Sequence, residues 1–153
     1  ERIYSALVWG KMPESSGEID APIGRSPLDR KKMAVVAEGG REAVTRYSVV
    51  DTLPPLQYIS LRLGTGRTHQ IRVHLSHLGR PVFGDPDYGG RKSRRGGVSG
   101  EEAGRARRAL KLIDRQALHA SELAFVHPVR GERMDFQAGL PDDFRAVMDA
   151  LGG

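Results

Sequence analysis

The chain has 153 residues, a formal net charge of +5 and a pI of about 9.9, and its hydrophobic (39%) and charged (28%) fractions predict one globular domain with its own core. Cysteine is absent, which excludes a disulfide framework and thiolate chemistry, and no apolar run reaches the ~18 residues that a membrane-spanning helix needs. The basic charge balance favours a polyanionic partner.

The first predicted elements are strands separated by a basic loop. Ile3–Trp9 is rich in branched and aromatic residues, which is typical of a strand. Glu18–Ile23 is a candidate short strand, and the loop over residues 24–32 carries Arg25 and three further basic side chains. Two more strands, Met33–Ala37 and Arg41–Leu53, flank a Gly-Gly pair, and this spacing predicts a hairpin between them.

The centre of the chain predicts a strand that leads directly into a helix. Polar and apolar residues alternate over Gln57–Leu63, which predicts a half-buried strand. A glycine turn follows, and Thr68 is then expected to cap a helix over Thr68–Leu78, with Gly79 as its C-terminal stop. Arg67, Thr68 and His69 therefore emerge at a strand-to-helix corner, a place suited to phosphate or carboxylate partners.

Helical spacing divides the side chains of this helix between two faces. One face is apolar and is expected to pack, whereas the other is polar and is expected to be free to act; it carries Gln70, His74 and His77. Arg72 lies on the flank between the two faces. Its guanidinium can form a bidentate pair with a carboxylate or a phosphate, which makes it the leading candidate for a functional residue.

The C-terminal half begins with a glycine-rich basic stretch, residues 89–104, which we predict to be a mobile loop. Its charges fit either a solvated loop or contact with an RNA backbone. A helix is then expected over Ala106–Asp114. Strands over Gln116–His127 and Glu132–Ala138 and a terminal helix with Pro141 at its first position follow; the expected core residues are Leu118, Leu123, Phe125, Phe144, Val147, Met148 and Leu151. These patterns predict an α+β fold, a mainly antiparallel mixed sheet with flanking helices.

Three other chemistries receive little support from the motifs. His74 and His77 are close enough to share a metal ion, but no HExxH pattern or cysteine ligand accompanies them, so we expect no metal site. Asp85 and Asp87 fit a turn better than a catalytic pair of carboxylates. Neither a Gly-x-Ser-x-Gly elbow nor a phosphate-binding loop of the Walker type is present, which disfavours hydrolysis.

The segment Thr65–His74, TGRTHQIRVH, together with the later glycine loop that ends at Tyr88 and Gly89, resembles the signature segment of RluA/RluD-type RNA pseudouridine synthases. Blocks elsewhere in the chain fit the same family in the same order; they include Tyr4-Ser5-Ala6, Ile23-Gly24-Arg25, Lys32-Met33-Ala34-Val35 and Leu118-His119-Ala120. The resemblance covers nearly the whole chain and implies a pseudouridine synthase-like catalytic domain.

This resemblance implies the isomerisation of uridines in ribosomal or transfer RNA, by a cytoplasmic monomer that needs no cofactor. It assigns Arg72 to the orientation of a catalytic aspartate and Tyr4 to stacking on the target uracil, although Tyr4 fits an ordinary aromatic of a sheet equally well. The residues it implies for substrate binding are Arg25, Leu63, Arg67, Thr68, His69, Gln70 and Ile71.

One family block is missing from the sequence. The family's His-Arg-Leu-Asp block, which carries the catalytic aspartate, occurs nowhere in residues 1–153. We therefore expect a C-terminal portion of a catalytic domain that is inactive alone, with the Arg72 guanidinium facing a gap. The alternatives are a noncatalytic RNA-binding module that retains the fold and a small structural domain without an RNA role.

Overall fold

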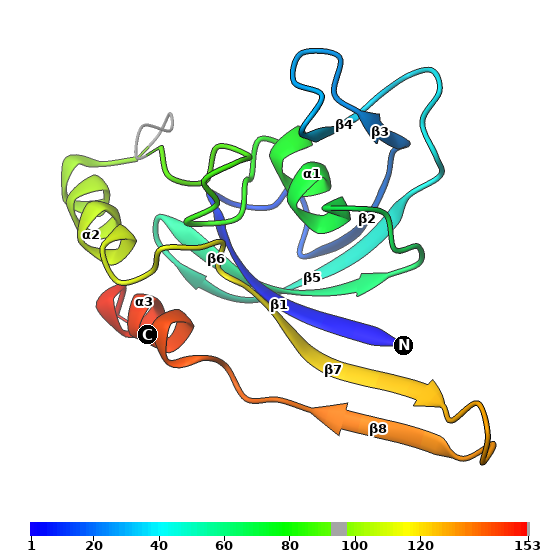
Figure 1. Ribbon diagram of the computed structural model, residues 1–153. Coiled ribbons are helices and arrows are strands. Elements are labelled where there is room, and N and C mark those ends of the chain that lie inside the picture. The colour runs from blue at the N-terminus through cyan, green and yellow to red at the C-terminus, as the bar shows by residue number, and fades with distance from the viewer. Residues whose placement is uncertain (93–97, 153) are drawn as a thin grey trace.

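The computed structural model describes residues 1–92 and 98–152, and it confirms the α+β fold (Figure 1). Its main sheet has six strands in the order β2-β5-β6-β1-β7-β8, and each neighbouring pair is antiparallel. The strands are β1 (Arg2–Trp9), β2 (Ser16–Asp20), β5 (Val44–Leu53), β6 (Leu56–Leu63), β7 (Leu118–Val126) and β8 (Arg133–Gln137). The main sheet is thus antiparallel, as predicted.

Three helices accompany the sheet in the described part of the chain. The helix α1 (Gln70–His77) lies across one side of the sheet, whereas α2 (Gly100–Leu110) and α3 (Asp142–Ala150) lie together at one end of it (Figure 1). A second, two-stranded sheet of β3 (Ile23–Arg25) and β4 (Met33–Val35) packs beside α1.

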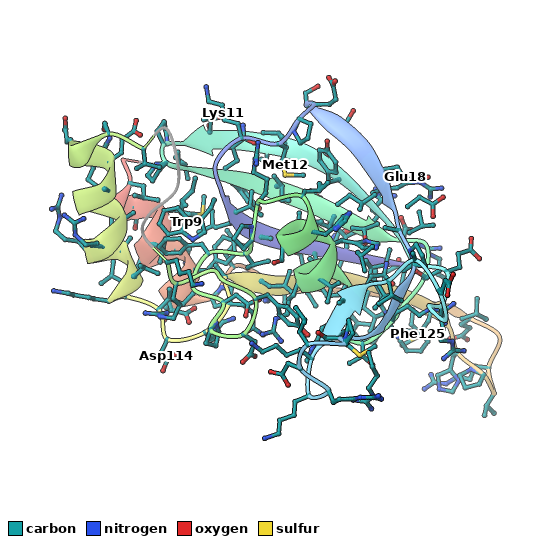
Figure 2. All side chains as sticks on the ribbon, turned by 90° about the horizontal axis from the view of Figure 1, so that it is seen from above. Trp9, Lys11, Met12, Glu18, Asp114 and Phe125 are labelled. Atoms are coloured by element: carbon teal, nitrogen blue, oxygen red, sulfur yellow. The ribbon has the colours of Figure 1, made fainter. Side chains whose placement is uncertain are left out.

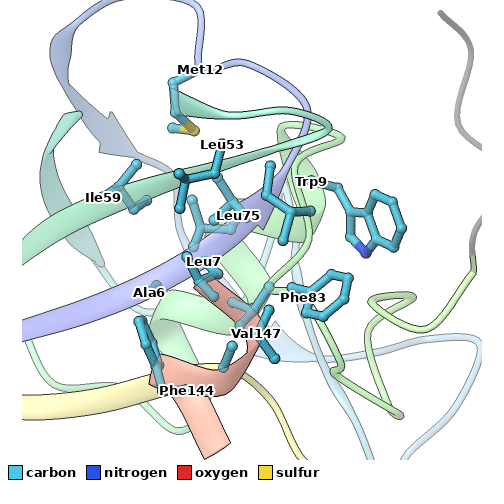
Figure 3. Packing of buried hydrophobic residues seen from close by; sticks show 14 of the residues in the cluster. Ala6, Leu7, Trp9, Met12, Leu53, Ile59, Leu75, Phe83, Phe144 and Val147 are labelled. Carbon is cyan, nitrogen blue, oxygen red and sulfur yellow. The ribbon is translucent and has the colours of Figure 1, made fainter. Parts of the chain in front are cut away.

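The main core fills the space between the middle of the sheet and the helices. Its largest fully buried side chains include Trp9, Phe83 and Phe144, with the ring centroids of Trp9 and Phe83 5.1 Å apart (Figure 3). As predicted, α3 directs Phe144, Val147 and Leu151 into this core, and all three are at most 3% exposed. Burial of such side chains supplies most of the driving force for folding.

The predicted hairpin across the Gly-Gly pair is wrong. β4 pairs with β3, while both edges of β5 are occupied by β2 and β6. The predicted strand over Glu18–Ile23 is in fact divided, because β2 pairs with β5 and the chain then leaves the main sheet to form β3. Tertiary pairing overrides the local turn signal here, since Gly40 is packed closely against Val36 and Pro22 instead of forming a tight two-residue loop.

The boundary between the basic loop and the next helix is also wrong. Residues 100–104 belong to α2, which begins six residues before the predicted start and ends at Leu110. The hydroxyl of Ser99 accepts a hydrogen bond from the Glu102 N–H (3.1 Å), and this Ser-x-x-Glu spacing is a helix-start signal that the sequence contains. Residues 93–97 lie outside the described part of the chain, so the mobility of the loop stays a prediction.

Two of the expected core positions lie at the surface. Leu123 and Phe125 of β7 are 38% and 42% exposed, although Leu118 is packed against the core. The turn before α3 differs slightly from expectation as well, because Pro141 is the N-cap of that helix and not its first residue.

Candidate active site

The strand-to-helix corner between β6 and α1 is built from a turn rather than from a capping threonine. The Gln70 N–H donates to the Arg67 carbonyl (3.1 Å), and His69 then takes a left-handed conformation (φ 54°) as the N-cap of α1 without a side-chain cap. The expected capping role of Thr68 is therefore wrong: Thr68 lies within the turn and is exposed. The corner nevertheless presents Arg67, Thr68 and His69 together, as expected.

The C-terminal end of α1 follows the prediction. Gly79 has a φ of 72°, its N–H donates to the Ser76 carbonyl (2.9 Å), and the Arg80 N–H donates to the Leu75 carbonyl (2.9 Å). These two bonds form a Schellman motif, in which glycine takes the left-handed position at no steric cost. The helix is thus fixed at both ends by backbone geometry.

The polar face of α1 is buried, which contradicts the expectation that it is free to act. Gln70 is 2% exposed and His74 is fully buried. The Gln70 Nε2 donates to the Val44 carbonyl (2.8 Å) and to the Thr45 Oγ1 (3.0 Å), and its Oε1 accepts from the Arg67 N–H (3.0 Å). The amide thereby ties the corner to β5, and only His77 of this face is exposed.

His74 completes this buried polar network. Its Nδ1 lies 2.7 Å from the Thr45 Oγ1 and its Nε2 lies 2.9 Å from the Ala21 carbonyl. Because a carbonyl can only accept, the Nε2 carries the proton and the Nδ1 accepts from the threonine hydroxyl. Burial lowers the pKa of His74 below its ordinary value, so the imidazole is held neutral.

The Arg72 guanidinium is held by two carboxylates. Its Nε and Nη2 donate to the two oxygens of Asp85 (2.8 and 2.7 Å), and Nη2 also donates to Asp87 (2.7 Å). Asp85 is fully buried and the Arg72 side chain is 9% exposed, whereas the Asp87 side chain is 53% exposed. Hydrogen bonding to Asp85, and to a smaller extent to Asp87, raises the pKa of Arg72 above its ordinary value.

The expectation that Arg72 faces a gap is therefore wrong for most of its donors. Its partners are supplied by the glycine loop that follows α1, because Asp85 lies there with both oxygens turned toward the helix. The bidentate pair fixes the plane of the guanidinium as well as its charge. Nε and Nη2 of this guanidinium thus have partners. Its third nitrogen, Nη1, has no hydrogen-bond partner among residues 1–92 and 98–152.

Asp85 also organises its own loop, as the turn interpretation expected. Its Oδ1 accepts hydrogen bonds from the N–H groups of Asp87 (3.0 Å) and Tyr88 (3.3 Å). A side chain at Gly90 would overlap the Val82 carbonyl, so glycine is required where the loop closes on itself. One buried carboxylate thus shapes the loop and holds the arginine.

Tyr88 is a residue that motif reasoning used only for recognition. The Arg72 guanidinium carbon lies 4.9 Å from the centroid of the Tyr88 ring, a cation–π distance. The Tyr88 hydroxyl accepts from the Met33 N–H (3.1 Å) and lies 2.8 Å from the His69 Nδ1. Tyr88 therefore connects the arginine, the corner and the small β3–β4 sheet.

The remaining predicted site residues are distributed around this cluster. Tyr4 and Leu63 are half-buried on the sheet, and Ile71 is 4% exposed within the main core. The Arg67 Nε donates to the Glu42 carbonyl (2.7 Å), while the Arg25 Nη1 donates to the Arg30 carbonyl (3.0 Å) at the edge of the basic loop. The fold brings Arg67 to the corner, whereas Arg25 ends β3 and does not belong to the loop predicted over residues 24–32.

Comparison with known proteins identifies the fold around this cluster. Residues 1–77 match the family model described as RNA pseudouridylate synthase. The chain belongs to this family. A protein of Chloroflexus aurantiacus named "Uncharacterized RNA pseudouridine synthase" is 47% identical over 98% of this chain and 42% of its own length. "Ribosomal large subunit pseudouridine synthase D" of Zymomonas mobilis is 42% identical over 98% of this chain and 44% of its own length.

Solved structures give the same result for this RNA pseudouridylate synthase family member. The structure of "Human RNA Pseudouridylate Synthase Domain Containing 1" is 31% identical with a TM-score of 0.69, over 98% of this chain and 58% of that chain. The chain thus spans less than half the length of the curated relatives described above. The pseudouridine synthase-like fold that the resemblance implied is confirmed.

Neither a metal-binding cluster nor a membrane-crossing helix is found among residues 1–92 and 98–152. In the described part of the chain, no group of three or more His, Asp or Glu side chains is arranged to hold a metal ion. None of the helices in residues 1–92 and 98–152 combines the length and the apolar character that a membrane crossing needs.

Proposed function

We propose that this chain is the C-terminal portion of the catalytic domain of an RNA pseudouridine synthase, which isomerises uridines in ribosomal or transfer RNA to pseudouridine. The observation that carries the proposal is the Arg72 guanidinium, buried and fixed in orientation inside the family's signature segment. An arginine held so firmly is suited to keeping a second carboxylate ionised and oriented.

The reaction requires the uracil to leave the base stack and lose its N1–C1′ bond. The detached ring then turns, rejoins the sugar through C5 and releases the proton from C5. The same uracil leaves and rejoins the same sugar, and the proton lost from C5 is balanced by a proton gained at N1, so the reaction needs no redox or group-transfer cofactor. The chain supplies an oriented cation at Arg72 and a half-buried aromatic ring at Tyr4. We assign the catalytic carboxylate to the part of the complete protein that precedes Glu1.

The contacts of Arg72 indicate where that carboxylate would bind. Asp85 occupies Nε and one position of Nη2, which leaves Nη1 and the position held by Asp87. Asp87 is half exposed and makes a single hydrogen bond to the guanidinium, so it is the easier of the two partners to displace. We therefore place the incoming carboxylate on the Nη1 side, with Asp85 as the fixed support.

The residues assigned to RNA lie at the surface around this position. Arg67, Thr68 and His69 at the corner, Leu63 on β6 and Arg25 at the end of β3 are at least partly exposed. Gln70 and Ile71 are almost completely buried, and they act instead by holding the corner in place. The net charge of +5 fits binding to an RNA backbone, and we expect a monomer that works in the cytoplasm.

The test is Arg72→Lys in the complete protein, with tritium release from C5-labelled uridine RNA measured beside filter binding. Lysine keeps the charge but cannot hold two carboxylates in one plane, so we expect turnover to fall by about 10²–10³-fold. RNA affinity should stay close to normal, because the guanidinium is buried away from the backbone.

A matched control uses the same substitution at the surface. Arg46→Lys alters an exposed ion pair with Glu18 and should change neither turnover nor stability by a measurable amount. The unfolding midpoint of each variant is recorded, so that lost turnover in a folded Arg72→Lys protein can be assigned to chemistry. Full turnover by that variant would remove Arg72 from the active site, and RNA binding without any turnover in the unmodified protein would identify a noncatalytic module.

A further inference from the structure

Tyr88 packs where α1 meets the small β3–β4 sheet, and Figure 2 shows α1 and β4 side by side above the main sheet. Its N–H donates to the Asp85 Oδ1 (3.3 Å), and its carbonyl accepts from the Ser76 hydroxyl of α1 (3.0 Å). Its half-buried side chain contacts the small second core, which contains Val73 of α1 and Ile23 of β3. The main chain of Tyr88 is thus fixed at both of its polar groups, and this backbone directs the side chain.

The ring of Tyr88 restrains the Arg72 guanidinium independently of the carboxylates. The guanidinium carbon lies over the ring, 4.9 Å from its centroid, and an aromatic face attracts a cation at this distance. The Asp85 carboxylate, by contrast, holds the guanidinium through N–H bonds that lie in the guanidinium plane. Loss of the ring would therefore leave both carboxylates in place and still allow the guanidinium to shift toward the space that the ring occupies.

The hydroxyl of Tyr88 bonds two segments of the surface around the arginine. It accepts from the Met33 N–H (3.1 Å) and lies 2.8 Å from the His69 Nδ1. Because the hydroxyl proton has no other acceptor in the described part of the chain, the His69 Nδ1 accepts it. His69 belongs to the corner before α1, and Met33 is the first residue of β4, directly after the basic loop of residues 26–32. One oxygen atom thus joins the corner to the base of the basic loop.

The basic loop that Met33 follows is folded on itself. The Ser26 N–H donates to the Lys32 carbonyl (2.9 Å), and the Nη1 of Arg25, at the end of β3, donates to the Arg30 carbonyl (3.0 Å). Arg25, Arg30 and Lys32 therefore lie in one compact unit that begins and ends in paired strands. A bond to the first residue of β4 fixes the base of this unit relative to the glycine loop, and an RNA backbone bound by its charges would be fixed with it.

We propose that Tyr88 is a positioning residue that couples bound RNA to the orientation of Arg72. The hydroxyl fixes the corner and the basic loop, and so the position of the RNA, whereas the ring fixes the guanidinium. One side chain then sets the distance between the substrate and the arginine that orients the catalytic carboxylate. This inference rests on the proposed function, because it takes Arg72 as part of the active site.

A tyrosine that served only to pack the second core would lead to a different expectation. Phenylalanine fills almost the same space, so its introduction would change stability a little and leave the RNA and the arginine unaffected. Coupling requires instead that the hydroxyl and the ring fail in different ways. Loss of the hydroxyl weakens the hold on RNA, whereas loss of the ring loosens Arg72.

The experiment compares Tyr88→Phe and Tyr88→Leu in the complete protein, with tritium release from C5-labelled uridine RNA measured over a range of RNA concentrations. Phenylalanine keeps the ring and loses only the hydroxyl, so we expect KM to rise about 5- to 10-fold while kcat stays within about 2-fold of the parent value. Leucine removes the ring as well, so kcat should also fall at least about 10-fold. A purely structural role would not divide the two constants in this way.

Two further measurements complete the design. Tyr58→Phe is the matched control, because the Tyr58 hydroxyl lies 3.3 Å from the Ser5 Oγ and the Tyr58 ring packs against Phe144 of α3. Its KM and kcat should match those of the parent. Exchange of the Arg72 Nε–H with water, detected by NMR, reports on the guanidinium without any turnover. We expect this exchange to be unchanged in Tyr88→Phe and at least about 5-fold faster in Tyr88→Leu.

Three results would overturn the proposal. A parent-like KM in Tyr88→Phe would show that the hydroxyl does not position RNA, and equal kcat values for the two variants would show that the ring does not support Arg72. Losses that follow the unfolding midpoints alone would reduce Tyr88 to a packing role.

A complete protein that makes no pseudouridine would refute the proposed function, and the coupling would then be judged without turnover. A loss of RNA affinity of about 5- to 10-fold in Tyr88→Phe by filter binding, together with faster Arg72 Nε–H exchange in Tyr88→Leu, would still support the coupling. The absence of either effect would overturn it.

Discussion

Two regions of the same face of the main sheet differ in how they are covered. Over β5 and β6 it is covered by α1, and the polar groups buried there, including Gln70 and His74, are hydrogen-bonded. Over β7 and β8 the same face presents Phe125 and Phe136 partly to solvent. In the first region hydrogen bonds hold α1 on the sheet and fix the orientation of Arg72, whereas in the second region apolar side chains are left partly exposed.

The largest loss of stability is expected from removing the carboxylate that supports Arg72. Asp85→Ala leaves a buried guanidinium with only the half-exposed Asp87, so we expect the complete protein to lose about 3–5 kcal/mol of unfolding free energy. Urea denaturation of the variant and the parent protein measures this loss.

Asp87→Ala is the matched control for that experiment. Its carboxylate is 53% exposed and its removal leaves the bidentate Asp85 pair intact, so the expected loss is below about 1 kcal/mol. Similar losses for the two variants would show that Asp85 is not the main support of the guanidinium.

A smaller effect is expected from the network that fastens α1 to β5. Thr45→Val keeps the shape of the side chain but removes the hydroxyl shared by His74 and Gln70, which should cost about 1–3 kcal/mol. The control is Thr52→Val, because the Thr52 hydroxyl meets Gln57 near the surface and its loss should cost far less. Denaturation curves that shift equally for both variants would argue against a special role for the buried network.

The same two regions show how far the sequence could be interpreted. Alternation along β6 and the branched and aromatic residues of β1 predicted two neighbouring strands of the antiparallel sheet, and the spacing of Phe144 and Val147 predicted the buried face of α3. These elements follow from local patterns that tertiary contacts reinforce. The prediction of a Gly-Gly hairpin was wrong because the pairing of a strand depends on contacts across the whole sheet and not only on the adjoining turn.

The site was predicted less completely, for a physical reason. The identity of Arg72 as a paired cation followed from its chemistry, but its partners Asp85 and Asp87 lie 13 and 15 residues away on a loop, and helical spacing carries no information about them. Polar side chains on a helix normally indicate a face that is exposed to solvent, so the burial of the face with Gln70 and His74 was not predicted. Leu123 and Phe125 were expected in a core because apolar residues of a predicted strand normally pack, but in this chain both side chains are partly exposed.

The smallest predicted effect concerns the charge state of His74. Burial lowers its pKa in the folded protein, so as the pH falls the unfolded chain binds this proton first, at about the ordinary value of 6.5. The contribution of neutral His74 to stability is therefore complete above about pH 6.5, and it is lost as the pH falls from there through the lower folded-state value. The slope cannot exceed about 1.4 kcal/mol per pH unit for one proton.

His74→Gln should flatten this part of the stability profile, since glutamine can still donate toward the Ala21 carbonyl but does not titrate. Unfolding midpoints at a series of pH values between 7.5 and 5 measure the slope, and His77→Gln on the exposed side of the same helix serves as the control. The His77 variant should keep most of the slope, because the charge on His77 is a smaller cause of the lowered His74 pKa than burial is. A slope that survives in the His74 variant would place the titrating group elsewhere, and α1 would then owe its position to packing and to Arg72 rather than to a neutral imidazole sealed against β5.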